Sequence, residues 1–320
     1  MDRVALKNLT HNAKDFLNVR KSDYKQWVFR YTFLELEKDL GVAGDITSRA
    51  VLGEAGSKPG TGTVYAQEDG VVAGLDEIMY FLVESDPRFR PRLGAFEVEL
   101  FVKDGASVKA GDKVMSLSGS VQDILAVERV VLNLLMRMSG VASYTRELVG
   151  QLEAEGLDTL IVPTRKTLWG LLDKKAVVLG GGGTHRLNLA DAVMIKDNHL
   201  KVLGGSVVGA LKGVADSEVC GRFVEIEVED ADSAVKAAEG LNGMKLESPA
   251  CVLFDNMKAS EIESALVTLK EKGLYDGILF EASGGISDEN FIEYARTGVD
   301  IVSMGCLTMG VSGMDFSLDL

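Results

Sequence analysis

The second half of the chain alternates short apolar runs with amphipathic segments. Six apolar runs occur from residue 158 onward: DTLIVP (158–163), AVMIK (192–196), FVEIEVE (223–229), CVLFD (251–255), GILFEA (277–282) and DIVSMG (300–305). Between them, segments such as DSAVKAAEG and ASEIESALVTLKEKG repeat apolar residues at helical spacing. Strands that alternate with helices in this way predict a parallel sheet, in either an α/β barrel or a doubly wound fold.

Polar residues or glycines stand at the end of each apolar run. They are Thr164–Arg165–Lys166, Lys196–Asp197–Asn198, Glu227, Asp255–Asn256, Ser283–Gly284–Gly285 and Gly305. A doubly wound sheet gathers its ligand groups at one switch point, whereas a barrel collects them from the ends of many strands. We therefore predict a TIM-like α/β barrel. Because six strands are clear and eight are not, we expect this barrel to be open and incomplete.

The first half of the chain has a mixed pattern. Residues 1–40 predict one or two helices, and Asp45 is placed to cap an element after the glycine-broken loop at 41–48. The segment 61–75 reads as two strands that form a hairpin around Asp69–Gly70, and alternation returns over 95–120. These elements predict an α/β domain with a mixed sheet and helices.

A long helical stretch, residues 121–156, connects the two halves, with an expected break at Ser139–Gly140. We therefore predict an N-terminal α/β domain over residues 1–136 and a barrel over residues 137–309. The tail, about residues 310–320, is expected to pack back on the first domain.

Composition narrows the class of partner. The formal net charge of −14 argues against nucleic acid or an anionic membrane surface as a partner. No apolar run is long enough to span a bilayer, and the first residues do not resemble a secretory signal. Cys220, Cys251 and Cys306 lack the spacing of a zinc site or a disulfide framework, so we expect all three to be small buried residues. A cytoplasmic location follows as an expectation.

Against this acidic background, residues 163–199 concentrate positive charge. The segment holds four consecutive glycines, two of the three histidines and a set of cations at the ends of apolar runs: Arg165, Lys166, His185, Arg186, Lys196 and His199. Cations at strand ends beside a glycine loop suit a ligand that carries carboxylates or phosphates. They exceed what one phosphate requires, which indicates a second, polycarboxylate ligand or a pyrophosphate.

Two further patterns suggest phosphate and metal chemistry. The sequence SGGI (283–286) precedes the predicted helix DENFIEYAR, and glycines before a helix expose backbone N–H groups to an anion. Together with Gly305 after the next strand, they predict a phosphate site on the last two strands, where barrels commonly hold one. Glu227 and Asp255, at the ends of neighbouring strands, are candidates for an acid/base pair or for Mg²⁺ ligands.

At these residues the chain resembles a known family, quinolinate phosphoribosyltransferase, also called carboxylating nicotinate-nucleotide pyrophosphorylase. The resemblance covers nearly the whole chain in order. Among its segments are TRKT (164–167), GGGGTHRLNLADAVMIKDNH (180–199), EIEVE (225–229), LFDN (253–256), EASGGI (281–286) and GVDIVSMGCLT (298–308). TRKT, HR (185–186) and IKDNH (195–199) together are highly specific.

The resemblance implies an activity and a fold. The family joins quinolinate to 5-phosphoribosyl-1-pyrophosphate and releases pyrophosphate and CO₂, which yields nicotinate mononucleotide for de novo NAD biosynthesis. It uses Mg²⁺ with the phosphoribosyl donor and no organic cofactor. Its fold is an N-terminal α/β domain followed by an open, seven-stranded α/β barrel, and it works as a homodimer or a larger homo-oligomer.

The resemblance also assigns roles to residues. Six cations would line the quinolinate and pyrophosphate site: Arg129, Arg165, Lys166, His185, Arg186 and Lys196. Thr164 would be a further substrate-binding residue. Glu227 and Asp255 would serve the ribose and the metal, and these two with Lys166 and Lys196 form the expected catalytic set. Ser283, Gly284 and Gly305 would hold the 5-phosphate, and Arg129 would enter from the neighbouring subunit.

The sequence departs from the family pattern at three places. Trp169 replaces a proline after TRKT, Met309 replaces a histidine near the phosphate end, and the segment around residues 240–250 is longer than usual. None of these removes an assigned charge. Two alternatives stay open: the molybdenum-utilisation relative of the family, which has another substrate, and a non-catalytic ligand-binding homologue. IKDNH favours the quinolinate enzyme, and the presence of both Glu227 and Asp255 argues against a binding-only role.

Overall fold

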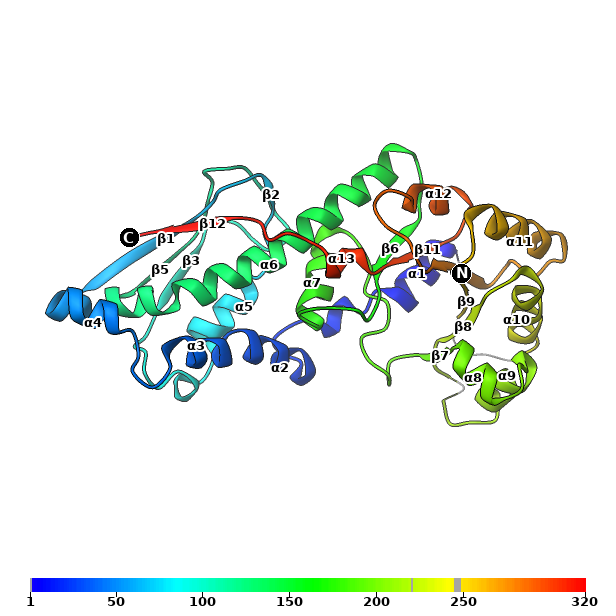
Figure 1. The fold of residues 1–320 in the computed structure, drawn as a ribbon, viewed down its shortest axis with the longest axis horizontal. Helices are drawn as coiled ribbons and strands as arrows, with labels where there is room; N and C mark the ends of the chain where they lie inside the picture. Colours follow the sequence, from blue (N-terminus) through cyan, green and yellow to red (C-terminus); the bar gives the residue numbers. More distant parts are fainter. Residues whose placement is uncertain (1, 220, 245–248) are drawn as a thin grey trace. The chain divides into compact units, whose positions relative to one another are not determined.

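The computed structural model describes residues 2–219, 221–244 and 249–320 (Figure 1). Contacts between residues divide the chain into two units. The barrel unit comprises residues 1–13, 148–166 and 182–309, and the sheet unit comprises residues 14–147, 167–181 and 310–320. The predicted boundary between residues 136 and 137 falls inside a single helix and stays a prediction.

The barrel unit contains one parallel sheet of six strands in the order β6-β11-β10-β9-β8-β7. The strands are β6 (Leu160–Pro163), β7 (Val193–Ile195), β8 (Val224–Val228), β9 (Ala250–Asp255), β10 (Ile278–Ser283) and β11 (Ile301–Met304). All six predicted strands are confirmed. β6 and β7 are consecutive in the chain but form opposite edges of the sheet, which is the strand order of a barrel left open between them. The family resemblance implies seven strands, and the described residues of this unit form six.

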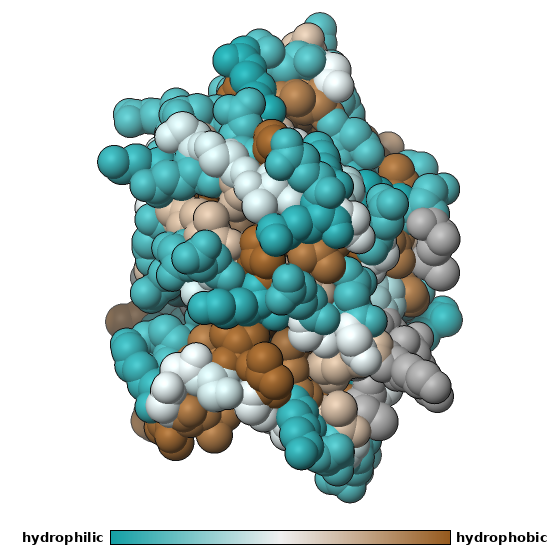
Figure 2. Space-filling view, turned by 90° about the vertical axis from the view of Figure 1, so that its right-hand side faces the viewer, coloured by the Kyte–Doolittle hydropathy of each residue, from teal (hydrophilic) through white to brown (hydrophobic). Residues whose placement is uncertain are grey.

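Helices accompany these strands. They are α1 (Arg3–His11), α8 (Asp197–Val202), α9 (Val207–Ala215), α10 (Ala231–Gly243), α11 (Ala259–Glu271), α12 (Phe291–Arg296) and α13 (Cys306–Met309). Side-chain caps fix several helix starts: Asp230 accepts a hydrogen bond from Ser233 N, and Ser206 accepts one from Gly209 N. The face drawn in Figure 2 is mostly hydrophilic, with smaller hydrophobic patches between the hydrophilic residues.

The core of this unit joins strands to the N-terminal helix. Leu6 of α1 packs in one cluster with the strand residues Val162, Cys251, Leu279 and Ile301. Arg3 of the same helix forms an ion pair with the Asp300 carboxylate. The first thirteen residues, predicted to belong to the N-terminal domain, therefore contribute to the interior of the barrel unit.

The sheet unit is built on an antiparallel sheet in the order β12-β1-β5-β3 (Figure 1). Its strands are β1 (Pro59–Ala66), β3 (Glu97–Leu100), β5 (Lys113–Ser120) and β12 (Phe316–Asp319), and a separate pair is formed by β2 (Gly70–Val71) and β4 (Ser107–Val108). Its helical elements are η1 (Lys14–Phe16), α2 (Ser22–Tyr31), α3 (Phe33–Leu40), α4 (Ile46–Leu52), η2 (Gly53–Ser57), α5 (Leu75–Met79), η3 (Tyr80–Glu84), η4 (Pro87–Phe89) and α7 (Leu171–Gly180). Asp45 caps α4, as predicted.

Two local predictions in this unit are wrong. The hairpin expected around Asp69–Gly70 does not form, because β1 pairs with β5 and β12 while β2 pairs with β4. The break expected at Ser139–Gly140 is also absent, since α6 (Val121–Ala154) runs through both residues. Ser139 Oγ accepts a hydrogen bond from Ala73 N, and the missing side chain of Gly140 makes room for the backbone at Ser312–Met314. These residues serve tertiary packing and not a helix end.

Within the described part of the chain, no helix has both the length and the apolar character needed to cross a bilayer.

Candidate active site

The predicted site residues of the barrel unit lie at the carboxyl ends of its strands. Thr164 follows β6, Lys196 follows β7, Asp255 and Ser283 end β9 and β10, and Gly305 follows β11. Ser283 is paired with Asp255 in the parallel register. Because all the strands run in one direction, these groups share one edge of the sheet, the edge at which barrel enzymes carry their active sites.

A cationic pocket of about 600 Å³ occurs at this unit. Its basic lining residues are Arg165, Arg186, Lys196, His199 and Arg222. Apolar side chains, among them Leu189, Val193 and Met194, complete the wall. The pocket therefore combines apolar walls for a ring with cations for acidic substituents.

Arg186 is the buried cation of this pocket, only 8% exposed. Burial and the neighbouring Arg165 lower the pKa of its guanidinium, while Glu225 and Glu227 oppose that effect. Two arginines that disfavour each other's charge gain free energy when an anion binds between them. The arrangement favours a ligand with more than one negative group.

Lys196 and Glu227 form an ion pair across the ends of β7 and β8. Burial raises the pKa of Glu227, Lys196 lowers it, and the nearby Asp255 raises it again. Asp255 accepts a hydrogen bond from Asn256 Nδ2 at 3.0 Å. Glu227 and Asp255 thus present carboxylate oxygens at neighbouring strand ends, the donor type that Mg²⁺ prefers.

The candidate phosphate-binding turn differs in part from the prediction. Ser283 and Gly284 are followed by a turn, and α12 begins only at Phe291, so the glycines do not directly precede a helix. Gly284 has φ +91°, and a side chain there would collide with Asn256. Gly305 lies beside Thr164 and Lys166, since a side chain there would approach Thr164 Oγ1 to 3.8 Å. Thr308 Oγ1 also donates a hydrogen bond to the Lys166 carbonyl at 2.6 Å, which ties the two strand ends together.

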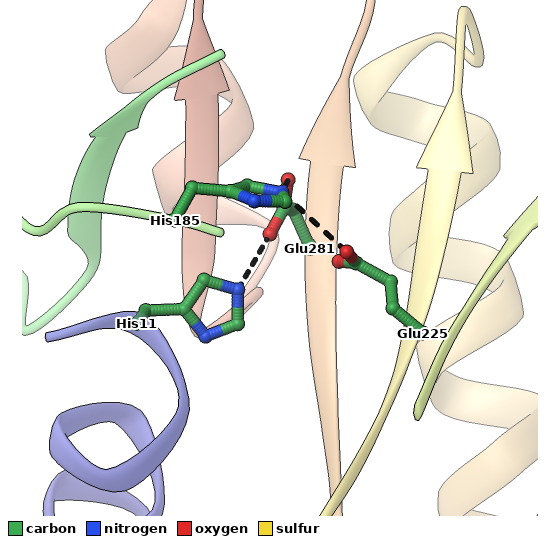
Figure 3. Close-up of side chains that lie close together, drawn as sticks. All are labelled: His11, His185, Glu225 and Glu281. Carbon is green, nitrogen blue, oxygen red and sulfur yellow. Dashed lines mark hydrogen bonds and ion pairs between the residues drawn. The ribbon is translucent and has the colours of Figure 1, made fainter. Parts of the chain in front are cut away.

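His185 occupies a different place from the other predicted cations. Its ring is buried among His11, Glu225 and Glu281 (Figure 3), and it is not among the lining residues of the cationic pocket. His185 Nε2 lies 3.3 Å from Glu281 Oε1 and 3.4 Å from Glu225 Oε2. His11 Nε2 lies 3.1 Å from Glu281 Oε2.

The two buried carboxyl groups of this cluster differ in electrostatics. Burial raises the pKa of Glu225 well above its ordinary value, and the adjacent Glu281 raises it further. Burial alone would raise the pKa of Glu281 as well, but His185 and His11 hold it below its ordinary range. The four side chains place one possible ligand atom each within 4.8 Å of one another, so they are also geometrically able to surround a metal ion.

The other predicted residues are placed as follows. Arg129 is an exposed residue of α6 in the sheet unit. Trp169 belongs to the same unit and stacks on Tyr31, with ring centroids 4.3 Å apart. Met309 is half-exposed, and residues 245–248 of the long 240–250 segment lie outside the described residues.

The expectation for the cysteines holds in part. Cys251 is buried, Cys220 lies outside the described residues, and Cys306 is only half-buried. The prediction is therefore wrong for Cys306, which starts α13 directly after the strand end at Gly305.

The sequence did not predict several residues of the site. Glu225 and Glu281 stand inside apolar strands, where a charged residue is rare unless it is paired, and this was the available signal. His11 gave no signal, because it reaches Glu281 from 270 residues away. Arg222 also lines the pocket, although it precedes β8 instead of following it.

Comparisons with known proteins agree with this architecture. Residues 45–139 match the family "Quinolinate phosphoribosyl transferase, N-terminal domain", and residues 141–319 match "Quinolinate phosphoribosyl transferase, C-terminal domain". A "Probable nicotinate-nucleotide pyrophosphorylase [carboxylating]" of Methanothermobacter thermautotrophicus is 38% identical over 280 residues, which cover 86% of this chain and 93% of that protein.

Two further similarities come from a plant and from a solved bacterial structure. "Quinolinate phosphoribosyltransferase [decarboxylating] 2, mitochondrial" of Nicotiana glauca is 35% identical over 90% of this chain and 80% of its own. The structure of the nicotinate-nucleotide pyrophosphorylase from Francisella tularensis superimposes with a TM-score of 0.75 at 28% identity, over 92% of this chain and 96% of that one. The chain belongs to the quinolinate phosphoribosyltransferase family.

Proposed function

We propose that this chain transfers the phosphoribosyl group of 5-phosphoribosyl-1-pyrophosphate to quinolinate, with loss of CO₂, and so forms nicotinate mononucleotide. The observation that carries the proposal is the cationic pocket, whose lining residue Lys196 forms an ion pair with Glu227. Quinolinate is a flat ring with two adjacent carboxylates, and the pocket offers apolar walls and five basic side chains.

In the proposed complex, the residues bind three parts of the substrates. Arg165, Arg186 and Lys196 bind the quinolinate carboxylates, and Lys166 with Arg129 adds positive charge for the pyrophosphate. Thr164, Ser283, Gly284 and Gly305 bind the 5-phosphate through hydroxyl and backbone N–H donors. His185 supports Arg186 from the buried side.

The proposed transfer step does not require a general base to activate quinolinate. The pyridine nitrogen of quinolinate attacks the anomeric carbon with its own lone pair, and pyrophosphate leaves with the bonding pair. Catalysis then consists of holding two anions in line and stabilising the charge that develops on the leaving group. After transfer, the ring nitrogen is cationic, so the electron pair left by CO₂ at the adjacent ring carbon is stabilised without an organic cofactor until that carbon takes up a proton.

A divalent metal completes the proposal. Glu227 and Asp255 fit a Mg²⁺ that arrives with the donor, because two carboxylates at neighbouring strand ends leave room for oxygens of the donor and of water. When bound, Mg²⁺ would supply positive charge to offset the negative charge of the pyrophosphate. Lys196, which lines the pocket, pairs with Glu227 and would hold that carboxylate in place.

The assembly and location follow the family resemblance. We propose a homodimer or a larger homo-oligomer that acts in the cytoplasm, with Arg129 supplied by the neighbouring subunit. Nucleic acid and membranes are not proposed as partners, given the net charge of −14.

The test is turnover by the purified chain. Quinolinate, the phosphoribosyl donor and Mg²⁺ are mixed with the protein, and nicotinate mononucleotide and CO₂ are measured, with and without prior dialysis against EDTA. We expect product only with Mg²⁺ present. Binding of quinolinate without product would support the ligand-binding homologue, and a lack of both would support a relative with another substrate. Full activity after exhaustive removal of metal would refute the proposed role of Glu227 and Asp255.

A further inference from the structure

We propose that His11 and Glu281 are positioning residues: they hold His185 in a left-handed backbone conformation and thereby direct Arg186 into the cationic pocket. The inference rests on the proposed function for its substrate. It assigns a role to the N-terminal helix, which lies far from every other site residue in sequence.

The first observation is backbone strain next to Arg186. His185 has φ +50°, one of two non-glycine residues with positive φ among the described residues. A non-glycine residue in this region costs on the order of 1–3 kcal/mol and persists only where surrounding contacts enforce it. The following residue is the buried arginine of the pocket, so the strained position sets the direction in which Arg186 leaves the backbone.

The second observation is the density of contacts that anchor the segment before Arg186. Thr184 N donates to the His11 carbonyl at 2.7 Å, and Thr184 Oγ1 accepts from Ala13 N at 2.9 Å. Gly183 N donates to the Ile161 carbonyl, and a side chain on Gly183 would meet the His11 carbonyl at 2.6 Å. The chain at the end of α1 thus holds Thr184 through its backbone N–H and its side-chain hydroxyl, and Ile161 of β6 holds Gly183.

The third observation is the side-chain network that orients the two imidazoles (Figure 3). Thr10 Oγ1 donates a hydrogen bond to the Leu6 carbonyl at 2.9 Å and lies 2.7 Å from His11 Nδ1. His11 therefore spans Thr10 on one side and Glu281 on the other. Glu281 in turn faces His185 through its second oxygen, and it links the two histidines.

The hydrogen bond at His185 Nδ1 favours this network over a metal site, although Glu225 Oε1 and Oε2 and Glu281 Oε1 are buried without a hydrogen-bond partner among the described residues. Arg186 N donates to His185 Nδ1 at 2.6 Å, so His185 carries its proton on Nε2, the atom that faces Glu281 and Glu225. A histidine that binds a metal through Nε2 keeps the proton on Nδ1 and donates it to a second group. That position already receives the Arg186 N–H. The geometry therefore supports a network that fixes Arg186 and not a metal centre.

The experiment compares Glu281→Gln and His11→Ala with the wild type. In Glu281→Gln the side chain keeps its shape and loses its charge. We expect kcat/KM for quinolinate to fall by about tenfold or more, with a much smaller change in KM for the phosphoribosyl donor. Glu281→Asp, which retains the carboxylate, is expected to recover part of the loss.

A double-mutant cycle separates positioning from general damage. If Glu281 acts through Arg186, Glu281→Gln has little further effect in an Arg186→Ala background, whereas independent effects multiply. Glu77→Gln is the matched control, because Glu77 is an equally buried carboxylate that bonds to Tyr24 and Lys175 in the sheet unit. It is expected to leave the kinetics with quinolinate unchanged.

Hydrogen exchange makes the test independent of turnover. Without any substrate, Glu281→Gln should accelerate amide exchange at residues 183–187, and Glu77→Gln should not. Unchanged protection of this segment, or full multiplicative effects in the cycle, would overturn the positioning role. A stoichiometric transition metal in the purified wild-type protein would overturn it in favour of a metal site. The wild type could prove inactive while Glu281→Gln still accelerates amide exchange at residues 183–187. That result would refute the proposed reaction and leave the positioning role supported.

Discussion

At the scale of single residues, Arg186 combines two properties that rarely coincide. It is nearly as buried as a core residue, and it is a cation beside another cation, Arg165. Such a group is costly in the free protein and becomes favourable only when an anion binds. Its contribution should therefore appear in binding and catalysis more than in the free energy of unfolding.

The corresponding prediction is a large kinetic loss in Arg186→Ala. We expect kcat/KM for quinolinate to fall by about 10²-fold or more, the scale for removal of a buried electrostatic donor, while thermal unfolding changes little. Lys236→Ala removes an exposed lysine of α10 and is the matched control. Near wild-type kcat/KM in a folded Arg186→Ala protein would contradict the assigned role.

A second residue, Asp104, predicts a pH dependence of stability. Burial and the nearby Glu77 raise its pKa from 3.8 to about 6, although Lys175 opposes the shift. Between these two values the folded chain retains a proton that the unfolded chain has lost. The contribution of Asp104 to the free energy of unfolding therefore falls by at most about 3 kcal/mol as pH rises from about 4 to 6. Above pH 6 this contribution stays low.

Chemical denaturation of the wild type and of Asp104→Asn tests this sign. The difference in unfolding free energy, wild type minus variant, should decrease between pH 4 and pH 7. A difference that stays constant or increases over that interval would show that the carboxyl group is ionised in the folded protein throughout.

Residue-level prediction from sequence succeeded where strand ends dictate position. Lys196, Glu227, Asp255 and Ser283 all lie where the apolar runs placed them, since a parallel sheet collects carboxyl ends at one edge. The burial of the His185 side chain outside the cationic pocket was not predictable. The directions of adjacent side chains in a loop depend on the backbone angle φ, and the sequence does not reveal that His185 has a positive φ.

At the scale of elements, α6 illustrates how a glycine can be read in two ways. Gly140 and Gly150 both lie in this helix. An added side chain at Gly140 would collide with the Ser312 carbonyl, whereas one at Gly150 would meet no atom within 4 Å. Sequence alone cannot separate the two, because Ser312 follows Gly140 by about 170 residues along the chain.

This contrast gives paired predictions. Gly150→Ala should stabilise the protein by up to about 1 kcal/mol through helix propensity. Gly140→Ala should destabilise it, because the same gain is outweighed by displacement of the backbone at residues 312–314. Thermal unfolding of the two variants measures both signs, and a stabilised Gly140→Ala would mean that the tail does not pack closely there.

Pairing between elements was the least predictable level. The alternating pattern of residues 61–75 correctly indicated extended chain, but β1 found its partners in β5 and β12 and not in β2. The two-residue repeat of a strand determines which side chains share a face, but it does not determine which other strand pairs with it. The barrel strands were easier, since consecutive parallel strands with intervening helices tend to lie side by side.

At the scale of the whole molecule, the proposed shared site makes a quantitative prediction. Arg129→Ala and Lys166→Ala are each expected to be inactive alone. If Arg129 acts on the neighbouring subunit, a mixed dimer contains one site with both residues intact and one with neither. Random mixing should then restore about a quarter of wild-type activity, by the symmetry of the dimer.

The comparison requires proof that subunits exchange, for example by mass spectrometry of differently labelled chains. If Arg129 acts within its own chain, every site carries one defect, and the mixture should remain at the level of the single variants. Absence of recovery after verified exchange would exclude the shared site.

The path of the chain through the two units bears on how it is made. The chain passes from one unit to the other after residues 13, 147, 166, 181 and 309. The partner of His11, Glu281, is synthesised 270 residues later. At about 5–20 residues per second, the ribosome delivers Glu281 roughly 15–55 seconds after His11. During that interval α1 has emerged but its place in the barrel does not exist, so nascent helix α1 is exposed to chaperones and proteases. A chain released before β10 would lack Glu281, the partner of His11, and Leu279, which packs against Leu6, so we expect such a chain to leave α1 unpacked.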